Sequence, residues 1–210
     1  MPKVDKDNPV FIEIEYPDRE LDRVTTFFRL FMIIPPLIIL SLLANSSVLW
    51  NRGPWTWQWP GLPGYVVSAT VLLILFAEKY PKWWFNWNLN LARFTTRIGA
   101  YFALLTDEFP STDEDQAVDL QLHYPDVKEE LHRAMPLIKW FLAIPHYVLL
   151  FFLNIVALML VIIAWFSILF TGRYPKALFD FVVGVFRWNL RVLAYAILLI
   201  TDEYPPFSLE

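Results

Sequence analysis

The residues best placed to do chemistry are two pairs of arginines, each pair spaced four residues apart in an apolar stretch. Residues three or four apart lie on one face of a helix. Each pair therefore belongs to a narrow polar stripe on a largely aromatic and aliphatic helix. The stripe residues that we single out are Arg93, Arg97 and Tyr101 in the first stripe, and Asp180, Arg187, Arg191 and Tyr195 in the second.

Three roles are open for these arginines. At a membrane surface they could bind anionic lipid headgroups, each contributing about 1 kcal/mol. Alternatively, Asp180 could form a polar cluster with Arg191, Tyr195 and Asp202. A third possibility is that the arginines only seat a helix at the surface.

Other reactive groupings are scarce. Without cysteine, the chain can form no disulfide, thiolate metal site or cysteine nucleophile. The histidines, His123, His132 and His146, lack metal-ligand spacing, and His146 follows a proline in an apolar helix, where we expect it to be packed. No glycine-rich phosphate loop is present. We therefore predict a non-enzymatic protein with no catalytic residue, no metal and no cofactor.

Composition indicates an integral membrane protein. Apolar residues make up 57% of the chain, and in the run 135–170 only Lys139 and His146 can ionise. That run is longer than the roughly 20 apolar residues that cross a bilayer. Basic residues flank the apolar segments and form no nucleic-acid footprint, so we expect no nucleic acid as a partner.

Much of the sequence occurs twice. Arg29 opens Arg-Leu-Phe-Met-Ile-Ile-Pro-Pro, and Lys139 opens Lys-Trp-Phe-Leu-Ala-Ile-Pro-His. Tyr-Pro-Lys occurs at 80–82 and 174–176, and Thr-Asp-Glu-aromatic-Pro follows each stripe. We expect two membrane repeats, residues 1–110 and 111–210.

Each repeat is expected to contain the same elements. An alternating apolar segment predicts a half-buried strand, and a proline predicts a kink in the first apolar helix. A second apolar helix completes a hairpin before the striped helix begins. The ranges are 10–16 and 118–124 for the strands, 29–46 and 139–154 for the kinked helices, 65–76 and 155–170 for the second helices, and 82–105 and 176–200 for the striped helices.

The striped helices decide the topology. If they span the bilayer, the two repeats are inverted; if they lie in the interface, the repeats are parallel. A central arginine costs roughly 2.5–3.5 kcal/mol on insertion scales, and the positive-inside rule favours parallel repeats. We predict an all-α membrane protein, a tandem repeat of helical hairpin plus amphipathic interfacial helix. The strands would pair on the cytoplasmic face, where we also place both termini.

Tryptophans gather between the first two apolar helices. Trp55, Trp57 and Trp59 in this loop, with Trp83 and Trp84 further on, suit a membrane–water interface. We predict that they are interface anchors; a loop that stacks on a ligand is the alternative.

These motifs resemble an uncharacterised bacterial membrane family, domain of unknown function 4389. The resemblance rests on the Lys139 motif, on Phe-Thr-Gly-Arg-Tyr-Pro at 170–175, on Arg-Trp-Asn-Leu-Arg-Val-Leu-Ala-Tyr at 187–195 and on Thr-Asp-Glu-Tyr-Pro-Pro-Phe at 201–207. The first copy departs from it, with Ala-Glu-Lys at 77–79 in place of Thr-Gly-Arg. The resemblance implies a membrane location and no established activity.

We expect a lipid-interacting scaffold or an accessory subunit of a larger complex in the bacterial cytoplasmic (inner) membrane. Its expected partners are membrane lipids, mainly anionic ones, and another protein or a second copy of the chain. A small transporter or channel built from inverted repeats is the alternative. A membrane enzyme acting on a lipid comes third, because it would need Asp180, Asp202 and His146 to meet.

Overall fold

The computed structural model describes residues 4, 9–17, 20–44, 62–112 and 114–210. The predicted loop anchors Trp55, Trp57 and Trp59 lie outside the described residues. Elsewhere the fold is mostly helical with a small two-stranded sheet, as predicted.

The sheet pairs β1 (Val10–Ile14) with β2 (Val118–Leu122) in antiparallel register. Ile12 lies opposite Leu120, and Ile14 lies opposite Val118. Alternate side chains point to opposite faces of a strand, so the apolar residues at even positions are buried, apart from the half-buried Leu122, and Glu13 is exposed on the outer face. The predicted strands and their pairing are confirmed.

Proline kinks both first apolar helices. In the first half, α1 (Arg23–Met32) gives way to α2 (Ile34–Ala44) just before Pro35. In the second half, α6 (Met135–Leu142) gives way to α7 (Ile144–Thr171) just before Pro145. Proline has no N–H and crowds the preceding turn, so the chain bends there in both halves.

The predicted hairpin in the second half is wrong. The 28 residues of α7 form one uninterrupted helix through the expected turn near 154–155. No glycine or proline lies between Pro145 and Gly172, so no residue favours a turn there. Asn154, the polar residue at the expected turn, donates to the Leu150 carbonyl of its own helix at 2.8 Å. In the first half, α3 (Leu62–Leu72) is a separate helix and ends in a π-helical turn, Leu73–Ala77.

The striped helices form close to their predicted bounds. They are α4 (Lys82–Phe102) and α8 (Lys176–Leu193), the latter continuing as a π-helical turn, Ala194–Leu198. A proline directly precedes each first turn, which suits it to a helix start. The short helix α5 (Val127–Glu130) leads from the sheet toward α6.

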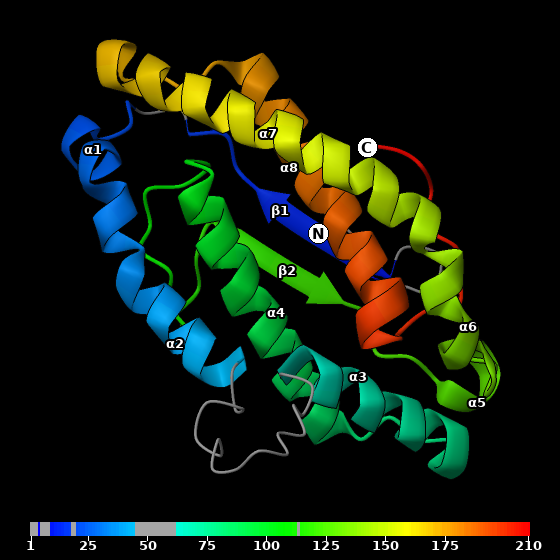
Figure 1. The fold of residues 1–210 in the computed structure, drawn as a ribbon. Helices are drawn as coiled ribbons and strands as arrows, with labels where there is room; N and C mark the ends of the chain where they lie inside the picture. Colours follow the sequence, from blue (N-terminus) through cyan, green and yellow to red (C-terminus); the bar gives the residue numbers. More distant parts are fainter. Residues whose placement is uncertain (1–3, 5–8, 18–19, 45–61, 113) are drawn as a thin grey trace, which may run out of the picture.

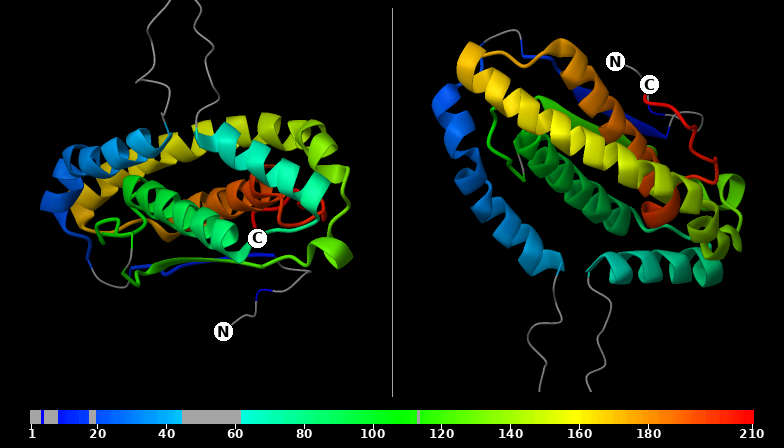
Figure 2. Two further views of the ribbon diagram at one scale, coloured as in Figure 1. Left: turned by 90° about the horizontal axis from the view of Figure 1, so that it is seen from below. Right: turned by 45° about the horizontal axis from the view of Figure 1, so that its top comes forward.

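The elements stack in layers on one face of the sheet. Helices α4 and α8 cover the sheet, and α1, α2, α3 and α7 lie beyond them, as the left view of Figure 2 shows. Figure 1 shows α4, α7 and α8 running in much the same direction as the strands. One apolar core joins both halves of the chain through the sheet, α4, α7 and α8.

Gly184 in α8 tests how closely the C-terminal segment packs on this helix. A Cβ atom there would lie 2.8 Å from the Leu209 carbonyl oxygen, which is backbone. We expect Gly184→Ala to lower the free energy of unfolding in detergent micelles by about 1–3 kcal/mol, the usual cost of overpacking.

Gly99→Ala in α4 is the matched control. Its Cβ would meet only the ring of Phe186, at 3.0 Å, and a side chain can rotate away. Alanine also favours a helix over glycine by about 1 kcal/mol, so we expect little net change. Equal losses in the two variants would contradict close packing of the C-terminal segment on α8.

Candidate functional site

A buried cation of α1 is held at the end of α4. Arg29 is 2% exposed and forms an ion pair with Asp107. Its Nη1 donates to the carbonyl oxygens of Tyr101 at 2.9 Å and Thr106 at 2.8 Å. The guanidinium carbon lies 4.4 Å from the centroid of the Tyr101 ring, within cation–π range. We call Arg29, Asp107 and Tyr101 the first clamp.

The second half holds a lysine in the matching way. Lys139 of α6 is fully buried, with Nζ 2.7 Å from Asp202 Oδ1. The same Nζ donates to the Thr201 carbonyl oxygen at 2.7 Å and lies 5.2 Å from the centroid of the Tyr195 ring. We call Lys139, Asp202 and Tyr195 the second clamp. Both clamps fasten a kinked helix to the segment that follows a striped helix.

Each clamp carboxylate also accepts a backbone N–H. Asp107 Oδ2 accepts from Asp22 at 3.2 Å, and Asp202 Oδ2 accepts from His132 at 2.6 Å. Burial lowers the pKa of Lys139, and the Asp202 carboxylate opposes that shift by favouring the charged amine. The carboxylates thus bind both a buried cation and the chain that leads into its helix.

Sequence reasoning did not identify these clamps. The sequence places Arg29 and Lys139 at the start of the predicted kinked helices and Thr-Asp-Glu just after the striped helices, and it predicts no contact between them. The available signal was that the basic residue and the aspartate recur together, in the same order, in both halves.

The arginines of α4 bind the free edge of β2. The His123 N–H bonds to the Pro9 carbonyl oxygen, so the paired ladder bonds fall at odd positions of β2, and the carbonyls at even positions point away from β1. Arg93 Nε donates to the Leu120 carbonyl oxygen at 2.7 Å. Arg97, which is buried, donates to the carbonyl oxygens of Val118 at 3.3 Å and Ser111 at 2.9 Å.

The stripe of α8 is used differently. Arg191 donates to the Ser208 carbonyl oxygen at 2.6 Å and so holds the C-terminal segment. Asp180 and Arg187 are exposed. Of the cluster considered for Asp180, the structure brings Tyr195 and Asp202 together through Lys139, and Arg191 and Asp180 lie apart from that contact. The lipid-headgroup role of both stripes stays a prediction.

The described tryptophan anchors lie at the start of α4. Trp83 is 70% exposed, whereas Trp84 donates to Thr70 Oγ1 at 3.0 Å and stacks on Trp87, with ring centroids 5.3 Å apart. Trp83 is therefore free to meet lipid, and Trp84 also ties α4 to α3.

His146 lies inside an aromatic cluster. It is fully buried, its Nδ1 accepts from Trp188 Nε1 at 3.0 Å, and its ring stacks on Phe207 at 4.2 Å between centroids. Since Nδ1 accepts, the ring is neutral with its proton on Nε2. The packed histidine expected from the sequence is what the structure contains.

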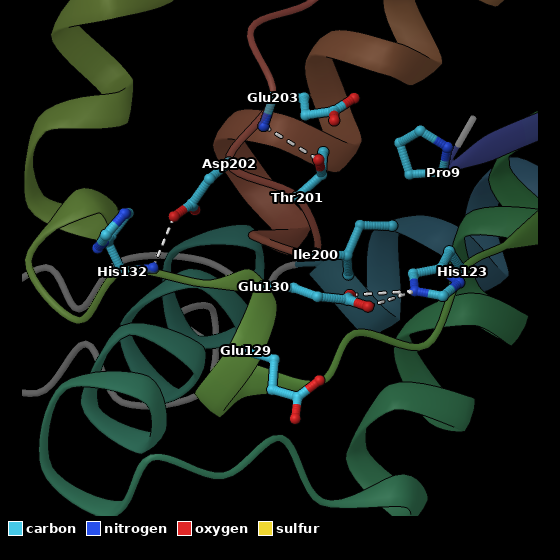
Figure 3. A pocket seen from close by; sticks show the side chains of 9 residues that line it. All are labelled: Pro9, His123, Glu129, Glu130, His132, Ile200, Thr201, Asp202 and Glu203. Atoms are coloured by element: carbon cyan, nitrogen blue, oxygen red, sulfur yellow. Dashed lines mark hydrogen bonds and ion pairs between the residues drawn. The ribbon is translucent and has the colours of Figure 1, made fainter. Parts of the chain in front are cut away.

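A cavity of about 280 Å³ lies beside the second clamp. Figure 3 shows His123 turned toward Glu130, with Nε2 to Oε2 at 3.1 Å, and the His132 backbone bonded to Asp202. These contacts link α5, the end of β2 and the second clamp. Among the described residues, no cluster of three or more metal-ligating side chains could hold a metal ion. The lining residues are Pro9, His123, Glu129, Glu130, His132, Ile200, Thr201, Asp202 and Glu203.

The second clamp makes a quantitative prediction. Breaking a buried ion pair by removing one partner costs about 3–5 kcal/mol, because it leaves an uncompensated buried charge. We expect Asp202→Asn to lower the free energy of unfolding by about 3 kcal/mol in detergent micelles. Lys139→Met/Asp202→Asn should cost at least about 1 kcal/mol less than the two single changes summed.

Glu203→Gln is the control, since this neighbouring carboxylate is exposed. We expect a change within about 0.5 kcal/mol, as for most surface substitutions. Strict additivity of Lys139→Met and Asp202→Asn would show that the two residues do not stabilise one another.

Three helices within the described residues are long and apolar enough to cross a membrane, by length and composition: Arg23–Leu43, Ile144–Thr171 and Lys176–Leu198. Their length and composition are those of a membrane protein and would allow several crossings. For the first two, only 22% of the most apolar window is buried within the protein. The remainder of these helices is available to lipid or to a partner.

Comparison with protein-family models gives a match in the second half of the chain. No curated protein and no solved structure matches the chain. Residues 133–208, from just before α6 to the C-terminal segment, match the family model described as a domain of unknown function (DUF4389). The matched region contains the second clamp, α7 and α8, and it matches the family model once.

Proposed function

We propose that this chain is a non-enzymatic scaffold or accessory subunit of a larger complex in the bacterial cytoplasmic membrane. The observation that carries this proposal is the contrast between its outside and its inside. Large apolar side chains point outward from α1, α2, α6 and α7, among them Phe31, Leu42, Phe141, Phe151 and Met159, each more than 60% exposed.

The strongest polar groups, by contrast, are committed to the interior. Arg29 and Lys139 hold carboxylates and backbone carbonyls, and Arg93 and Arg97 hold the edge of β2. Side chains that already hold the fold together are poorly placed to transform a substrate. What the protein offers its surroundings is an apolar surface, which suits lipid contact and assembly.

We further propose that residues 1–110 and 111–210 are tandem copies of one unit. The repeated sequence aligns Ile12 with Leu120, and these residues lie opposite each other in the sheet. The register is therefore symmetric about that pair. Matching contacts also cross between the halves: the Tyr16 hydroxyl donates to the Tyr174 carbonyl oxygen, and the Tyr124 hydroxyl donates to the Tyr80 carbonyl oxygen.

This symmetry favours parallel copies over inverted ones. An antiparallel strand pair has its two-fold axis perpendicular to the sheet, and exposed carboxylates such as Glu13 require the outer face of the sheet to meet water. The two-fold axis then lies along the membrane normal. In inverted-repeat transporters the corresponding axis lies in the membrane plane. Both copies would present β1 and β2 to the same aqueous side, which we propose to be the cytosol.

Anionic lipids are the lipid partners that the charges favour. Arg23 at the start of α1, Lys82 at the start of α4, and Arg173 and Lys176 between α7 and α8 are exposed. They lie at the ends of apolar helices, where headgroup phosphates would be within reach.

The lipid part of this proposal is tested at Arg173 and Lys176. We expect Arg173→Gln/Lys176→Gln to weaken binding of phosphatidylglycerol to the purified protein by about five-fold per removed charge, the equivalent of about 1 kcal/mol each. Binding is measured by lipid titration in a neutral detergent at low salt. Glu13→Gln, on the outer face of the sheet, is the control and should not weaken binding.

The assembly part is tested by isolating the tagged full chain from its native membrane in mild detergent. We expect a stoichiometric complex with another protein or with a second copy, which would cover part of the exposed apolar faces of α1, α2 and α7 and leave the rest to lipid. The mass of the particle and the identity of its components are measured. A particle containing only one chain and lipid would argue against an accessory subunit.

A further inference from the structure

We propose that the outer apolar helices lie within a single leaflet, along the membrane plane, and do not cross the bilayer. The structure assigns this surface to lipid acyl chains of the leaflet that faces the sheet. The inference rests on the membrane location proposed above and adds to it the depth and direction of insertion.

The helices run parallel to the plane of the sheet. In the left view of Figure 2 the sheet is seen nearly edge-on, with α4 and α8 over it and α1, α2, α3 and α7 stacked beyond. All of these helices run along the sheet, and none rises from it as a column. A membrane plane parallel to the sheet is therefore also parallel to the helices.

The outer face of the sheet carries carboxylates, which must stay in water. This face carries Glu13 and Glu15, both exposed, with Asp119 opposite Glu13. Side chains of this kind cost several kcal/mol in hydrocarbon without a partner. If α7 stood upright in the bilayer, the sheet beside it would stand upright too and carry these carboxylates into the hydrocarbon.

The depth of the helix layers above the sheet matches the hydrocarbon thickness of one leaflet. Layers of packed helices lie about 8–10 Å apart, and a helix layer covers a sheet at a similar distance. The outermost layer is thus about 20 Å from the sheet, and its apolar side chains extend about 5 Å further. A leaflet has about 15 Å of hydrocarbon under its headgroups. The stack fits one leaflet when the sheet lies in water and the α4–α8 layer begins at the headgroups.

Only one side of α7 packs against the protein. Its packed side is a single stripe, and the side chains around the rest of the helix are exposed and apolar, including Phe151, Phe152, Met159, Ile163 and Phe166. Between His146 and Arg173 the chain contains no aspartate, glutamate, lysine, arginine or histidine. A helix at the membrane surface itself would need a polar face toward water, so α7 must be the deep layer, with α8 between it and the sheet. The packed stripe consists of His146, Leu150, Ala157, Val161, Ala164 and Ile168.

The length of α7 is compatible with crossing the bilayer and with lying in one leaflet. At 1.5 Å per residue, the 28 residues of α7 extend about 42 Å, more than the roughly 30 Å of a hydrocarbon core. A helix of that length can cross, but it can equally extend along one leaflet. The fixed relation of α7 to a charged sheet favours the second placement.

Cysteine accessibility distinguishes the two placements, since the chain contains no native cysteine. Lys128→Cys in α5 and Arg173→Cys lie before and after the α6–α7 pair, and both positions are exposed. Glu13→Cys marks the side of the sheet, and Phe152→Cys marks the exposed apolar face of α7. Each variant is treated with a membrane-impermeant maleimide, in intact spheroplasts and in inverted vesicles.

We expect Lys128→Cys, Arg173→Cys and Glu13→Cys to be labelled from the same side only, and Phe152→Cys to be labelled only after detergent is added. Labelling of Lys128→Cys and Arg173→Cys from opposite sides would overturn the in-plane placement. Protection of Glu13→Cys from both sides would overturn it too, because the sheet would then not face water.

A carbonate wash of the same membranes separates this inference from the proposed function. Release of the native chain by carbonate would contradict insertion into the membrane altogether. Retention of the chain, with opposite labelling at positions 128 and 173, would refute only the in-plane placement.

Discussion

The fold depends on two buried cations: Arg29 is held by a carboxylate and two backbone carbonyls, and Lys139 by a carboxylate and one backbone carbonyl, each at or just after the end of a striped helix. Apolar side chains do little to fix the position of a helix in lipid, because lipid tails are as apolar as the neighbouring helices. A charged group inside such a shell has few acceptable partners, and Asp107 and Asp202 supply them. The clamps thereby fix where each kinked helix lies relative to α4 and α8.

The two clamps differ in the number of acceptors that bind the buried cation. Arg29 reaches two carbonyls and a carboxylate with its planar fork, whereas Lys139 presents one charged atom to a carbonyl and a carboxylate. Similarly, Arg93 binds a strand carbonyl and has Asp119 at 3.8 Å, while Arg187, at the matching position of α8, is exposed. The residue that matches Asp119 in β1 is Phe11, which offers no charge. The contact of α4 with β2, which crosses between the halves, is therefore more polar than the matching contact of α8 with β1.

Local patterns predicted much of the fold because they are local in origin. Alternation in 10–14 and 118–122 gave the strands, Pro35 and Pro145 gave the kinks, and the four-residue spacing of the arginines gave the striped helices. The hairpin in α7 failed because a long apolar run without glycine or proline has no turn signal and simply continues. The clamps escaped because their partners are 78 residues apart in the first half, and spacing alone cannot pair residues at that range.

The arginine stripes also explain how so small a sheet persists. A two-stranded hairpin or ribbon is marginal in water unless another element packs on it, and its free edges present unpaired carbonyls. Arg93 and Arg97 supply donors to the even-numbered carbonyls of β2 and, through the same contacts, lock α4 onto its face. Arginine side chains that would be costly in hydrocarbon thus find hydrogen-bond acceptors at the edge of the sheet. Because those acceptors belong to the sheet, the arginines bind α4 to the polar side of the molecule and leave the apolar helices on the other.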